Sequence, residues 1–403
     1  MRATHSVLFE RREQIAPLTI NRPEAMNALD PGVLSCLSRQ PDRVRADPRI
    51  AAAIITGVDL LGQCATTEDF RIGTQAFVDK TRPVFVEHER QHQEVPMTEK
   101  TQARDFLAIA ADQYPLGATE WRHGGDTRGR NVVIIVPATS VKARYYHRFA
   151  EYLFASGCDV VTFDYRSIGA SRPADMRAID ASYIEWGRHD VEAILKHVVA
   201  RYPGQPIDVV AHSIGGFTLG IAPSSHRVRR MLTVGAQIAY WPDYVLRKRL
   251  QMMLRWHLFM PLVAQLFGYF PGTRLGWIED TPLGVVKQWS AFHRNFDRKP
   301  WKRHRNDPSL PLLFELFQGE TLAISIADDE WGTRSAILRL LRLYTKAQKY
   351  HLHLAPADIG ESEIGHFAYF NQKFADSLWP LALRWIQTGS MPDPFQSRIL
   401  KVG

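Results

Sequence analysis

Residues 207–216 read Ile-Asp-Val-Val-Ala-His-Ser-Ile-Gly-Gly, in which a run rich in β-branched residues leads directly into a serine and a pair of glycines. A helical pattern follows, so the stretch predicts a strand, a sharp turn and a helix. A serine at such a turn is a nucleophile elbow, which needs small residues two positions before and after the serine. Ala211 and Gly215 occupy these positions, with alanine where glycine is usual. Ser213 is therefore a candidate nucleophile, and the alternative is a buried serine in an ordinary strand–turn–helix unit.

The segments around this stretch alternate between strand patterns and helix patterns. The run at 131–136 has no regular polar alternation, which is typical of a strand covered on both faces. An antiparallel strand pair is expected before it, at 106–111 and 118–121. The other expected strands are 159–163, 207–211, 229–234, 321–327 and 350–354, and the expected helices are 145–156, 184–201 and 333–344. This order predicts an α/β fold with a mostly parallel central sheet flanked by helices.

Two later stretches supply the partners that a serine nucleophile needs. A serine hydroxyl is a weak nucleophile without an adjacent base, and in this arrangement an acid and then a histidine follow it along the chain. The strand expected at 321–327 leads into carboxylates that include Asp328 and Asp329, and a loop near the end of the chain carries His366. We expect one carboxylate to orient His366, which would take the proton of Ser213 and then deliver it to the leaving group.

These motifs together resemble the α/β-hydrolase superfamily over about residues 100–390, and within it a bacterial group of predicted hydrolases. The matching segments are Asp-Tyr-Arg-x-x-Gly-x-Ser at 164–171, Asp-Asp-x-Trp at 328–331 and Ile-Gly-His-Phe at 364–367. The resemblance implies Ser213 as the nucleophile and His366 as the general base and acid. Acids of this superfamily usually lie four residues before the first proline or threonine of the next helix. The resemblance therefore favours Asp329 as the acid, with Asp328 as the alternative.

An oxyanion formed at Ser213 would need two preorganised hydrogen-bond donors. The backbone N–H of Ile214, the residue after the nucleophile, is the expected first donor. The second is expected from the loop after the 131–136 strand, which reads Val-Pro-Ala-Thr-Ser in place of the common His-Gly. Because proline has no N–H, Ala138 and Thr139 are the candidates, and its position favours Thr139.

The segment 235–318 separates two expected sheet strands and is predicted to form a helical, aromatic-rich cap. The flanking parts of the core are expected at 101–234 and 319–403. Five of the ten tryptophans of the chain lie in the segment, namely Trp241, Trp256, Trp277, Trp289 and Trp301. A cap over the serine would shape an apolar pocket for a small-molecule acyl substrate, or the aromatic side chains form only the core of the cap. A third interpretation is weak contact with a membrane surface through 250–270, beside the basic run 247–249.

Residues 1–90 have a different pattern. Strands are expected at 7–11, 15–20 and 50–56, and a helix at 31–46. The motif Asn-Arg-Pro-Glu-Ala-Met-Asn-Ala-Leu-Asp at 21–30 resembles the enoyl-CoA hydratase (crotonase) family, and 67–85 resembles the C-terminal helix and tail of that family. The middle part of the family, with its oxyanion glycines and catalytic acids, has no counterpart between 62 and 66. We therefore expect a truncated segment without hydratase activity, followed by a linker at 91–100.

Length, charge and cysteine content restrict the possible functions further. The 403 residues suffice for two or three domains. Of the net charge of +8, a surplus of +6 lies in 235–318, which contains twelve Lys and Arg against six Asp and Glu. No nucleic-acid-binding motif occurs, so we expect no nucleic-acid partner. Cys36, Cys64 and Cys158 form neither a disulfide framework nor a metal-binding spacing, so we expect a cytoplasmic protein without metal or cofactor. No secretory leader or membrane-length apolar run is visible.

The favoured hypothesis is a serine hydrolase that cleaves a carboxylic ester or thioester through an acyl-enzyme intermediate. The alternatives are acyl transfer to an acceptor other than water, another reaction on the same scaffold, and a binding protein without catalysis. The identity of the substrate and the oligomeric state are left open.

Overall fold

The computed structural model describes residues 7–9, 15–20, 52–56, 103–125, 127–294 and 313–403. The chain separates into two compact units, which we call unit 1 (Met1–Thr98) and unit 2 (Glu99–Gly403). In the described ranges, no helix is long and apolar enough to cross a membrane.

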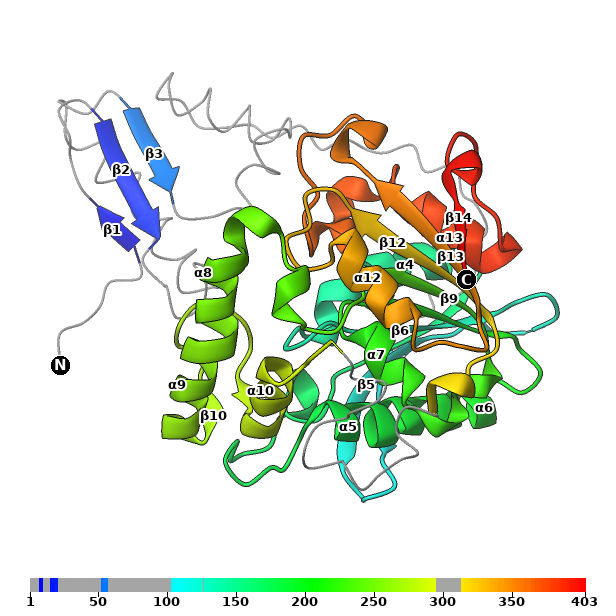
Figure 1. The fold of residues 1–403 in the computed structure, drawn as a ribbon, viewed down its shortest axis with the longest axis horizontal. Coiled ribbons are helices and arrows are strands. Elements are labelled where there is room, and N and C mark those ends of the chain that lie inside the picture. The colour runs from blue at the N-terminus through cyan, green and yellow to red at the C-terminus, as the bar shows by residue number, and fades with distance from the viewer. Residues whose placement is uncertain (1–6, 10–14, 21–51, 57–102, 126, 295–312) are drawn as a thin grey trace, which may run out of the picture. The chain divides into compact units, whose positions relative to one another are not determined.

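Unit 1 contains a three-stranded sheet (Figure 1). The strands are β1 (Val7–Phe9), β2 (Ile15–Ile20) and β3 (Ala52–Thr56). β1 pairs with β2 antiparallel, and β2 pairs with β3 in parallel. The three strands predicted here are thus present. The helix predicted at 31–46, the segment 67–85 and the linker at 91–100 lie outside the described residues.

Unit 2 is built on a nine-stranded sheet in the order β14-β13-β12-β9-β8-β6-β7-β5-β4. Its strands are β4 (Arg104–Ile109), β5 (Pro115–Trp121), β6 (Val132–Val136), β7 (Asp159–Phe163), β8 (Ile207–His212), β9 (Val228–Val234), β12 (Glu320–Ile326), β13 (Gln348–Leu354) and β14 (Leu400–Val402). Six strands are parallel to one another, namely β6, β7, β8, β9, β12 and β13. The strands β4 and β5 at one edge and β14 at the other edge pair antiparallel. The mostly parallel sheet predicted from the sequence is confirmed.

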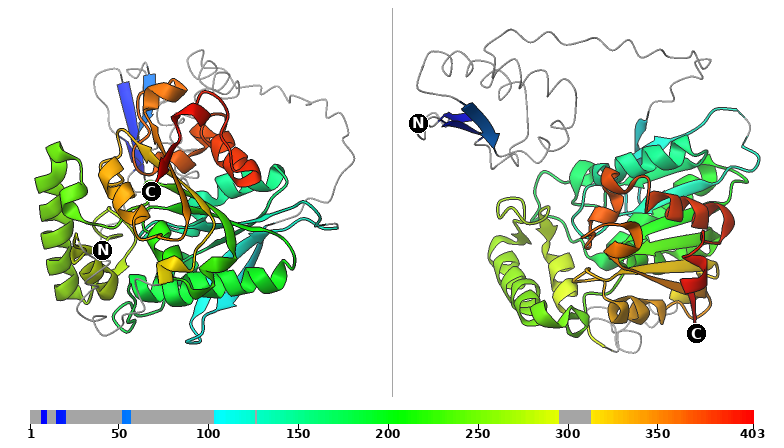
Figure 2. Two further views of the ribbon diagram at one scale, coloured as in Figure 1. Left: turned by 45° about the vertical axis from the view of Figure 1, so that its right-hand side comes forward. Right: turned by 90° about the horizontal axis from the view of Figure 1, so that it is seen from above.

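Helices bury both faces of this sheet (Figure 2). Alternate side chains of β6 enter different hydrophobic clusters, Val132 and Ile134 on one face and Val133 and Ile135 on the other. Apolar side chains of α6 and α7 contribute to the first cluster, and those of α4 and α13 to the second. The helices are α4 (His147–Ala155), α5 (Tyr183–Glu185), α6 (Glu192–Arg201), α7 (Gly215–Gly220), α12 (Arg334–Leu341) and α13 (Trp379–Thr388). Because both faces are covered, the central strands need apolar residues on both faces, as Val132–Val136 has.

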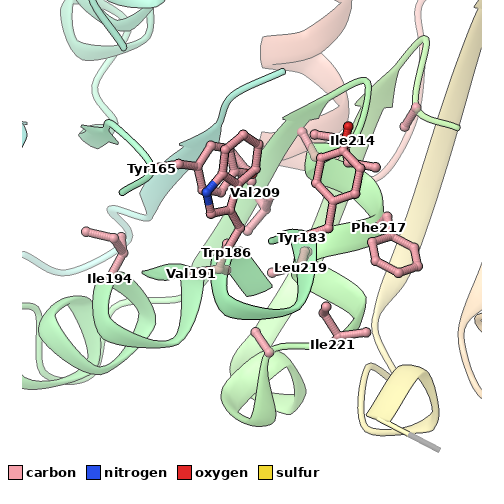
Figure 3. Close-up of a cluster of buried hydrophobic side chains, with 14 of the residues drawn as sticks. Tyr165, Tyr183, Trp186, Val191, Ile194, Val209, Ile214, Phe217, Leu219 and Ile221 are labelled. Carbon is pink, nitrogen blue, oxygen red and sulfur yellow. The ribbon is translucent and has the colours of Figure 1, made fainter. Parts of the chain in front are cut away.

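A π-helical segment, Trp186–Val191, joins α5 to α6 and packs against α7 (Figure 3). Its Trp186 ring stacks on Tyr165 with ring centroids 4.3 Å apart and an interplanar angle of 7°. A Cβ atom at Gly187 would lie 2.2 Å from the side chain of Ile221 at the end of α7, so only glycine allows this approach. These contacts hold α7, the helix that begins just after Ser213, against the core.

Between β9 and β12 lies a helical insertion. One continuous helix comprises α8 (Arg249–Met253), a π-helical segment (Leu254–Phe259) and α9 (Met260–Phe267). A short hairpin of β10 (Tyr269–Phe270) and β11 (Thr281–Pro282) follows, and then α10 (Leu283–Ser290), which packs on α9 (Figure 1). Residues 295–312 of this segment, including Trp301, lie outside the described residues.

The helix α13, the strand β14 and the β10–β11 hairpin of unit 2 are not among the sequence predictions. β14 has only three residues, two of them exposed, so it carries no periodic apolar pattern that a sequence could reveal. The other predicted strands and helices of unit 2 are present, and their ends differ from the predictions by a few residues. The long helix predicted at 184–201 contains the π-helical segment, which leaves no mark in the apolar spacing.

Candidate active site

Ser213 lies at the turn between β8 and α7, and its backbone has a φ of 53°. This left-handed conformation costs a non-glycine residue of the order of 1–3 kcal/mol and persists only where the surroundings impose it. The Ser213 N–H donates to the carbonyl of Val234 at 3.0 Å. A Cβ atom at Gly215 would lie 2.6 Å from the carbonyl oxygen of Val136, so glycine is required where α7 meets the loop after β6. The elbow predicted from the sequence is thus present.

The three residues predicted as nucleophile, base and acid lie together at the carboxyl ends of the parallel strands. Ser213 Oγ is 3.0 Å from His366 Nε2, and His366 Nδ1 is 2.7 Å from Asp329 Oδ2. Asp329 follows β12 and His366 follows β13, and all three side chains are buried. The carboxyl ends of parallel strands meet at one edge of a sheet, which explains why residues 153 positions apart come into contact.

The Asp329 carboxylate is held by hydrogen bonds on both of its oxygens. Oδ1 accepts from the N–H groups of Trp331 at 2.8 Å and Gly332 at 2.7 Å, while Oδ2 faces His366. Burial by itself would raise the Asp329 pKa, but the interaction with His366 and the two amides hold this pKa below its ordinary value. Asp329 is therefore ionised at neutral pH and can orient an imidazole ring.

Asp328, the alternative acid, has a different neighbour. Its Oδ2 accepts from the N–H of Ile364 at 2.8 Å, and so connects the turn after β12 to the loop that carries His366. The structure brings Asp329, and not Asp328, to the imidazole of His366.

Gly235, directly after β9, was not among the predicted site residues, but the site depends on it. Its φ is 58°, and a Cβ atom there would lie 2.8 Å from Asp329 Oδ2 and 3.0 Å from His366 Nδ1. A side chain at this position would therefore push into the contact between the carboxylate and the imidazole. The only sequence signal is a glycine at the end of a strand, which by itself is common.

A second layer of hydrogen bonds lies behind the site, around His212. His212 Nε2 is 2.9 Å from the carbonyl oxygen of His366, and Nδ1 is 2.8 Å from the hydroxyl of Tyr146. That hydroxyl also accepts from the N–H of Ala138 at 3.0 Å. The carbonyl can only accept, so Nε2 carries the proton, Nδ1 accepts from Tyr146, and the directions are mutually consistent. This series of hydrogen bonds connects the loop after β6, the end of β8 and the loop of His366.

This arrangement requires a neutral His212. Burial is the main reason that the His212 pKa falls to about 3, and the nearby His366 lowers it further. The ring thus stays neutral at ordinary pH and can accept from Tyr146 while it donates to the carbonyl of His366. The sequence did not reveal the part played by Tyr146.

The hydrogen bond between Tyr146 and Ala138 changes one prediction about the oxyanion donors. The Ala138 N–H is already bound to Tyr146, so Ala138 is not free to donate to an oxyanion. The N–H groups of Thr139 and Ile214 have no acceptor among the residues that the structure describes. The Thr139 side chain is held by Tyr183, with 3.0 Å between the two hydroxyl oxygens.

A cavity of about 140 Å³ opens at Ser213 and His366. Its wall is mainly aromatic, with Trp256, Trp277 and Trp289 from the insertion and Trp331 from the turn after β12. The other lining residues are Ala138, Thr139, Tyr183, Ile214, Gln237, Ala239, Arg255, Ile278 and Phe367. Trp241, also in the insertion, is 39% exposed and does not line the cavity. Three of the five tryptophans noted in 235–318 therefore line the same cavity as Ser213.

Comparison with known proteins gives a family match within unit 2. Residues 127–275 match the family described as "Serine aminopeptidase, S33". This match, the order of the sheet and the serine elbow identify unit 2 as an α/β-hydrolase. The family match and the fold support a hydrolase of the α/β-hydrolase type, as the sequence motifs implied.

Similar solved structures include three that each cover about 70% of this chain. DcsB in complex with its substrate analogue is 16% identical, and the likeness covers 71% of this chain and 99% of that chain at a TM-score of 0.47. The esterase Pf2001 of Pyrococcus furiosus is 13% identical, with 71% and 92% covered and a TM-score of 0.46. The thioesterase domain from the curacin biosynthetic pathway is 16% identical, with 70% and 99% covered and a TM-score of 0.42.

A curated relative matches a short part of the chain. The (E)-benzylidenesuccinyl-CoA hydratase of Thauera aromatica is 42% identical over 62 residues, which are 15% of this chain and 24% of the hydratase. The chain thus spans about a quarter of the length of this relative, which is too little to carry over its activity.

Replacing Gly235 with alanine should separate the geometry of the site from the stability of the fold. We expect kcat/KM to fall by about 10² or more, because the new Cβ displaces Asp329 or His366. Gly204 also has a positive φ, 77°, but open space around it, so Gly204→Ala is a matched control. Both variants should lose about 1–2 kcal/mol of unfolding free energy through the left-handed backbone. Equal activity in the two variants would contradict the proposed crowding at Gly235.

The low pKa of His212 predicts a loss of stability on mild acidification. With a folded-state pKa of about 3 against an ordinary value of about 6.5, the unfolded chain binds the proton first as the pH falls. The unfolding free energy should therefore drop by about 2 kcal/mol between pH 6.5 and 5 through this residue. Denaturant unfolding of the wild type and of His212→Gln at several pH values measures the effect. The unfolding free energy of the variant should change less with pH than that of the wild type. An identical change with pH in the two proteins would show that His212 does not titrate as described.

Proposed function

We propose that this protein is a serine hydrolase that cleaves a carboxylic ester or thioester through an acyl-enzyme intermediate. Ser213 would act as the nucleophile, His366 as the general base and acid, and Asp329 as the residue that orients His366. The observation that carries the proposal is the hydrogen-bonded line from Asp329 through His366 to Ser213, which ends at the wall of a cavity.

In the first half-reaction, Ser213 Oγ attacks the carbonyl carbon of the substrate while His366 Nε2 takes the hydroxyl proton. The carbonyl π electrons move to the oxygen, which becomes an oxyanion in contact with the N–H groups of Ile214 and Thr139. Asp329 stabilises the imidazolium without taking its proton. Collapse of the tetrahedral intermediate breaks the C–O or C–S bond, and His366 gives the proton to the departing alcohol or thiol.

Water completes the cycle by the same route. His366 removes a proton from a water molecule, and the hydroxide adds to the acyl carbon and forms a second oxyanion. When this intermediate collapses, Ser213 leaves with the proton from His366, and a carboxylic acid is released. Each oxyanion donor is worth about 10²–10³ in turnover in other enzymes of this kind, so the loop after β6 should contribute to turnover alongside the triad.

The composition of the cavity favours an ester or thioester over the free amino terminus of a peptide. An aminopeptidase has to recognise an ammonium group, and an acidic side chain is the usual partner of such a group in a low-dielectric site. None of the residues that line the described cavity is Asp or Glu. The cavity therefore favours an ester or thioester substrate over a peptide amino terminus.

Removal of Ser213 tests the proposal. Ser213→Ala should lower kcat for short-chain nitrophenyl esters and acyl thioesters by about 10⁴ or more, while circular dichroism stays unchanged. Asp329→Asn should cost about 10⁴ because the imidazole loses its orientation. Asp328→Asn is the matched control, and its loss should stay below about tenfold because Asp328 contacts only a backbone amide. If Ser213→Ala retained wild-type turnover, the proposed function would be wrong.

A further inference from the structure

In the described part of the chain, the cavity beside Ser213 has one arginine in its wall, Arg255, and it has no anionic partner there. It lies in the π-helical segment of the insertion and lines the cavity together with Ser213 and His366. Its guanidinium carbon lies 3.6 Å from the centroid of the Trp277 ring and 4.9 Å from that of Trp256. These two rings fix the guanidinium in the aromatic wall.

Among the described residues, the Arg255 side chain has no hydrogen-bond partner. Its Nε is buried and has no hydrogen-bond partner, and Arg255 forms no ion pair within the described part of the chain. Five other arginines of unit 2 have acidic partners. Arg166 contacts Asp190 and Asp112, Arg172 contacts Asp280, Arg229 contacts Asp208, Arg230 contacts Glu320, and Arg339 contacts Asp243. Arg255 is only partly buried, so its guanidinium is accessible to pair with the anion of a ligand that enters the cavity.

A second polar group in the same cavity lacks a partner. Gln237 is 5% exposed, lies just after β9 and lines the cavity, and its Oε1 is buried without a hydrogen-bond partner in the described chain. The amide of a glutamine can present either its oxygen or its NH₂ group to a ligand. Arg255 and Gln237 thus give a mostly aromatic cavity two free polar contacts.

We infer that Arg255 binds a carboxylate of the substrate, so that the preferred substrate is an ester or thioester that also carries a carboxylate. A guanidinium matches a carboxylate with two parallel N–H···O bonds, a geometry that ammonium groups do not offer. The cavity is close in size to an engineered cavity that binds benzene, which limits the enclosed group to about six heavy atoms. A short dicarboxylic half-ester or half-thioester fits these limits. This inference rests on the proposed function. It restricts the substrate class expected from the sequence, an apolar acyl compound, to acyl compounds that also carry a carboxylate.

Matched substrate pairs test the inference. On the acyl side, the glutaryl thioester of N-acetylcysteamine is compared with its methyl-ester derivative. On the alcohol side, 4-carboxyphenyl acetate is compared with methyl 4-acetoxybenzoate. The wild type should prefer the anionic member of at least one pair by about ten- to a hundredfold in kcat/KM, mainly through KM. Arg255→Met should reduce this ratio to about one, and Arg255→Lys should keep part of it.

The controls separate binding from structure and from catalysis. Arg274, an exposed arginine of the insertion that does not line the cavity, gives the matched variant Arg274→Ala, which should keep the wild-type ratio. Binding of glutarate to Ser213→Ala can be monitored by tryptophan fluorescence and needs no turnover. This binding should be lost in the double variant Ser213→Ala/Arg255→Met. The inference would be overturned if Arg255→Met lowered kcat/KM equally for both members of every pair. It would also be overturned if the wild type preferred the neutral members, or if glutarate binding did not depend on Arg255. A lack of esterase activity together with Arg255-dependent glutarate binding would instead overturn the proposed function alone.

The outer side of the same insertion helix has a second unusual feature. Leucine recurs at every fourth position and stays 45–82% exposed, at Leu246, Leu250, Leu254, Leu258, Leu262 and Leu266. We call this set the leucine row. The opposite side of the helix is buried through Met252, Trp256, Met260 and Ala264, which have the same spacing. A four-residue repeat drifts by about 40° per step around an α-helix, and the wider π-helical turn at Leu254–Phe259 counteracts this drift.

The charges around the leucine row indicate its partner. No Asp or Glu occurs between 246 and 267, whereas this stretch begins with Arg247, Lys248 and Arg249, of which Lys248 pairs with Glu330. Arg247 is exposed at the start of the row. At the other end, the exposed Arg177 donates from Nε to the carbonyl of Phe267 at 3.0 Å. An apolar row between exposed cations fits a lipid surface with anionic headgroups. We propose that the leucine row rests on such a surface, with the helix in the plane of the interface.

Vesicle sedimentation tests this second proposal. The wild type should bind phosphatidylcholine vesicles that contain phosphatidylserine about tenfold better than phosphatidylcholine alone. The variant Leu250→Glu/Leu258→Glu/Leu262→Glu should lose this binding. Leu107→Glu/Ile109→Glu changes two exposed apolar residues of the edge strand β4 and should keep it. No vesicle binding by the wild type, equal loss in both variants, or a wild-type dimer that the leucine substitutions dissociate would overturn the proposal.

Discussion

The active site of this α/β-hydrolase depends on the close approach of α7 to the loop after β6. At Gly215 the two backbones are so near that even a methyl group would lie 2.6 Å from the carbonyl of Val136. That approach forces the chain to turn within one residue, which places Ser213 in a left-handed conformation at the end of β8. The stacked pair of Trp186 and Tyr165, and the glycine beside Trp186, hold the other end of α7 in the core. The strain at the serine is thus maintained by packing on both sides of the helix.

The remaining parts of the site are arranged around this fixed serine. Three loops meet there, after β6, β12 and β13, and each is connected to another by hydrogen bonds. Asp328 connects the turn after β12 to the loop of His366, and the chain through Tyr146 and His212 connects that loop to the one after β6. One buried, neutral histidine next to Ser213 therefore links the segment that holds His366 to the segment that carries Thr139. In this account, the acid–base and oxyanion halves of the site are positioned by the same hydrogen-bonded chain.

The sequence reveals those features that depend on local pattern or on chain order. The strand at 131–136 is visible because burial on both faces requires a run without regular polar alternation, and Ser213, a carboxylate at 328 or 329, and His366 follow from the order of motifs along the chain. Features that arise from the meeting of distant segments are not visible. Nothing in the sequence indicates that Tyr146 occupies the amide of Ala138, that Gly235 lies against Asp329, or that Arg255 enters the cavity of Ser213 between tryptophans. The sequence alone also could not separate Asp328 from Asp329 without the superfamily spacing, because both end the same strand.

Covalent trapping of the nucleophile is the most direct test of the central claim that Ser213 is activated by His366 and Asp329. A fluorophosphonate probe reacts with an activated serine, and loss of fluoride leaves a phosphonyl group on its oxygen. Peptide mapping by mass spectrometry should find a single adduct, on the peptide that contains Ser213, formed much more slowly in Asp329→Asn and absent in Ser213→Ala. A folded wild-type protein that stays unlabelled, or that is labelled on another residue, would contradict the account.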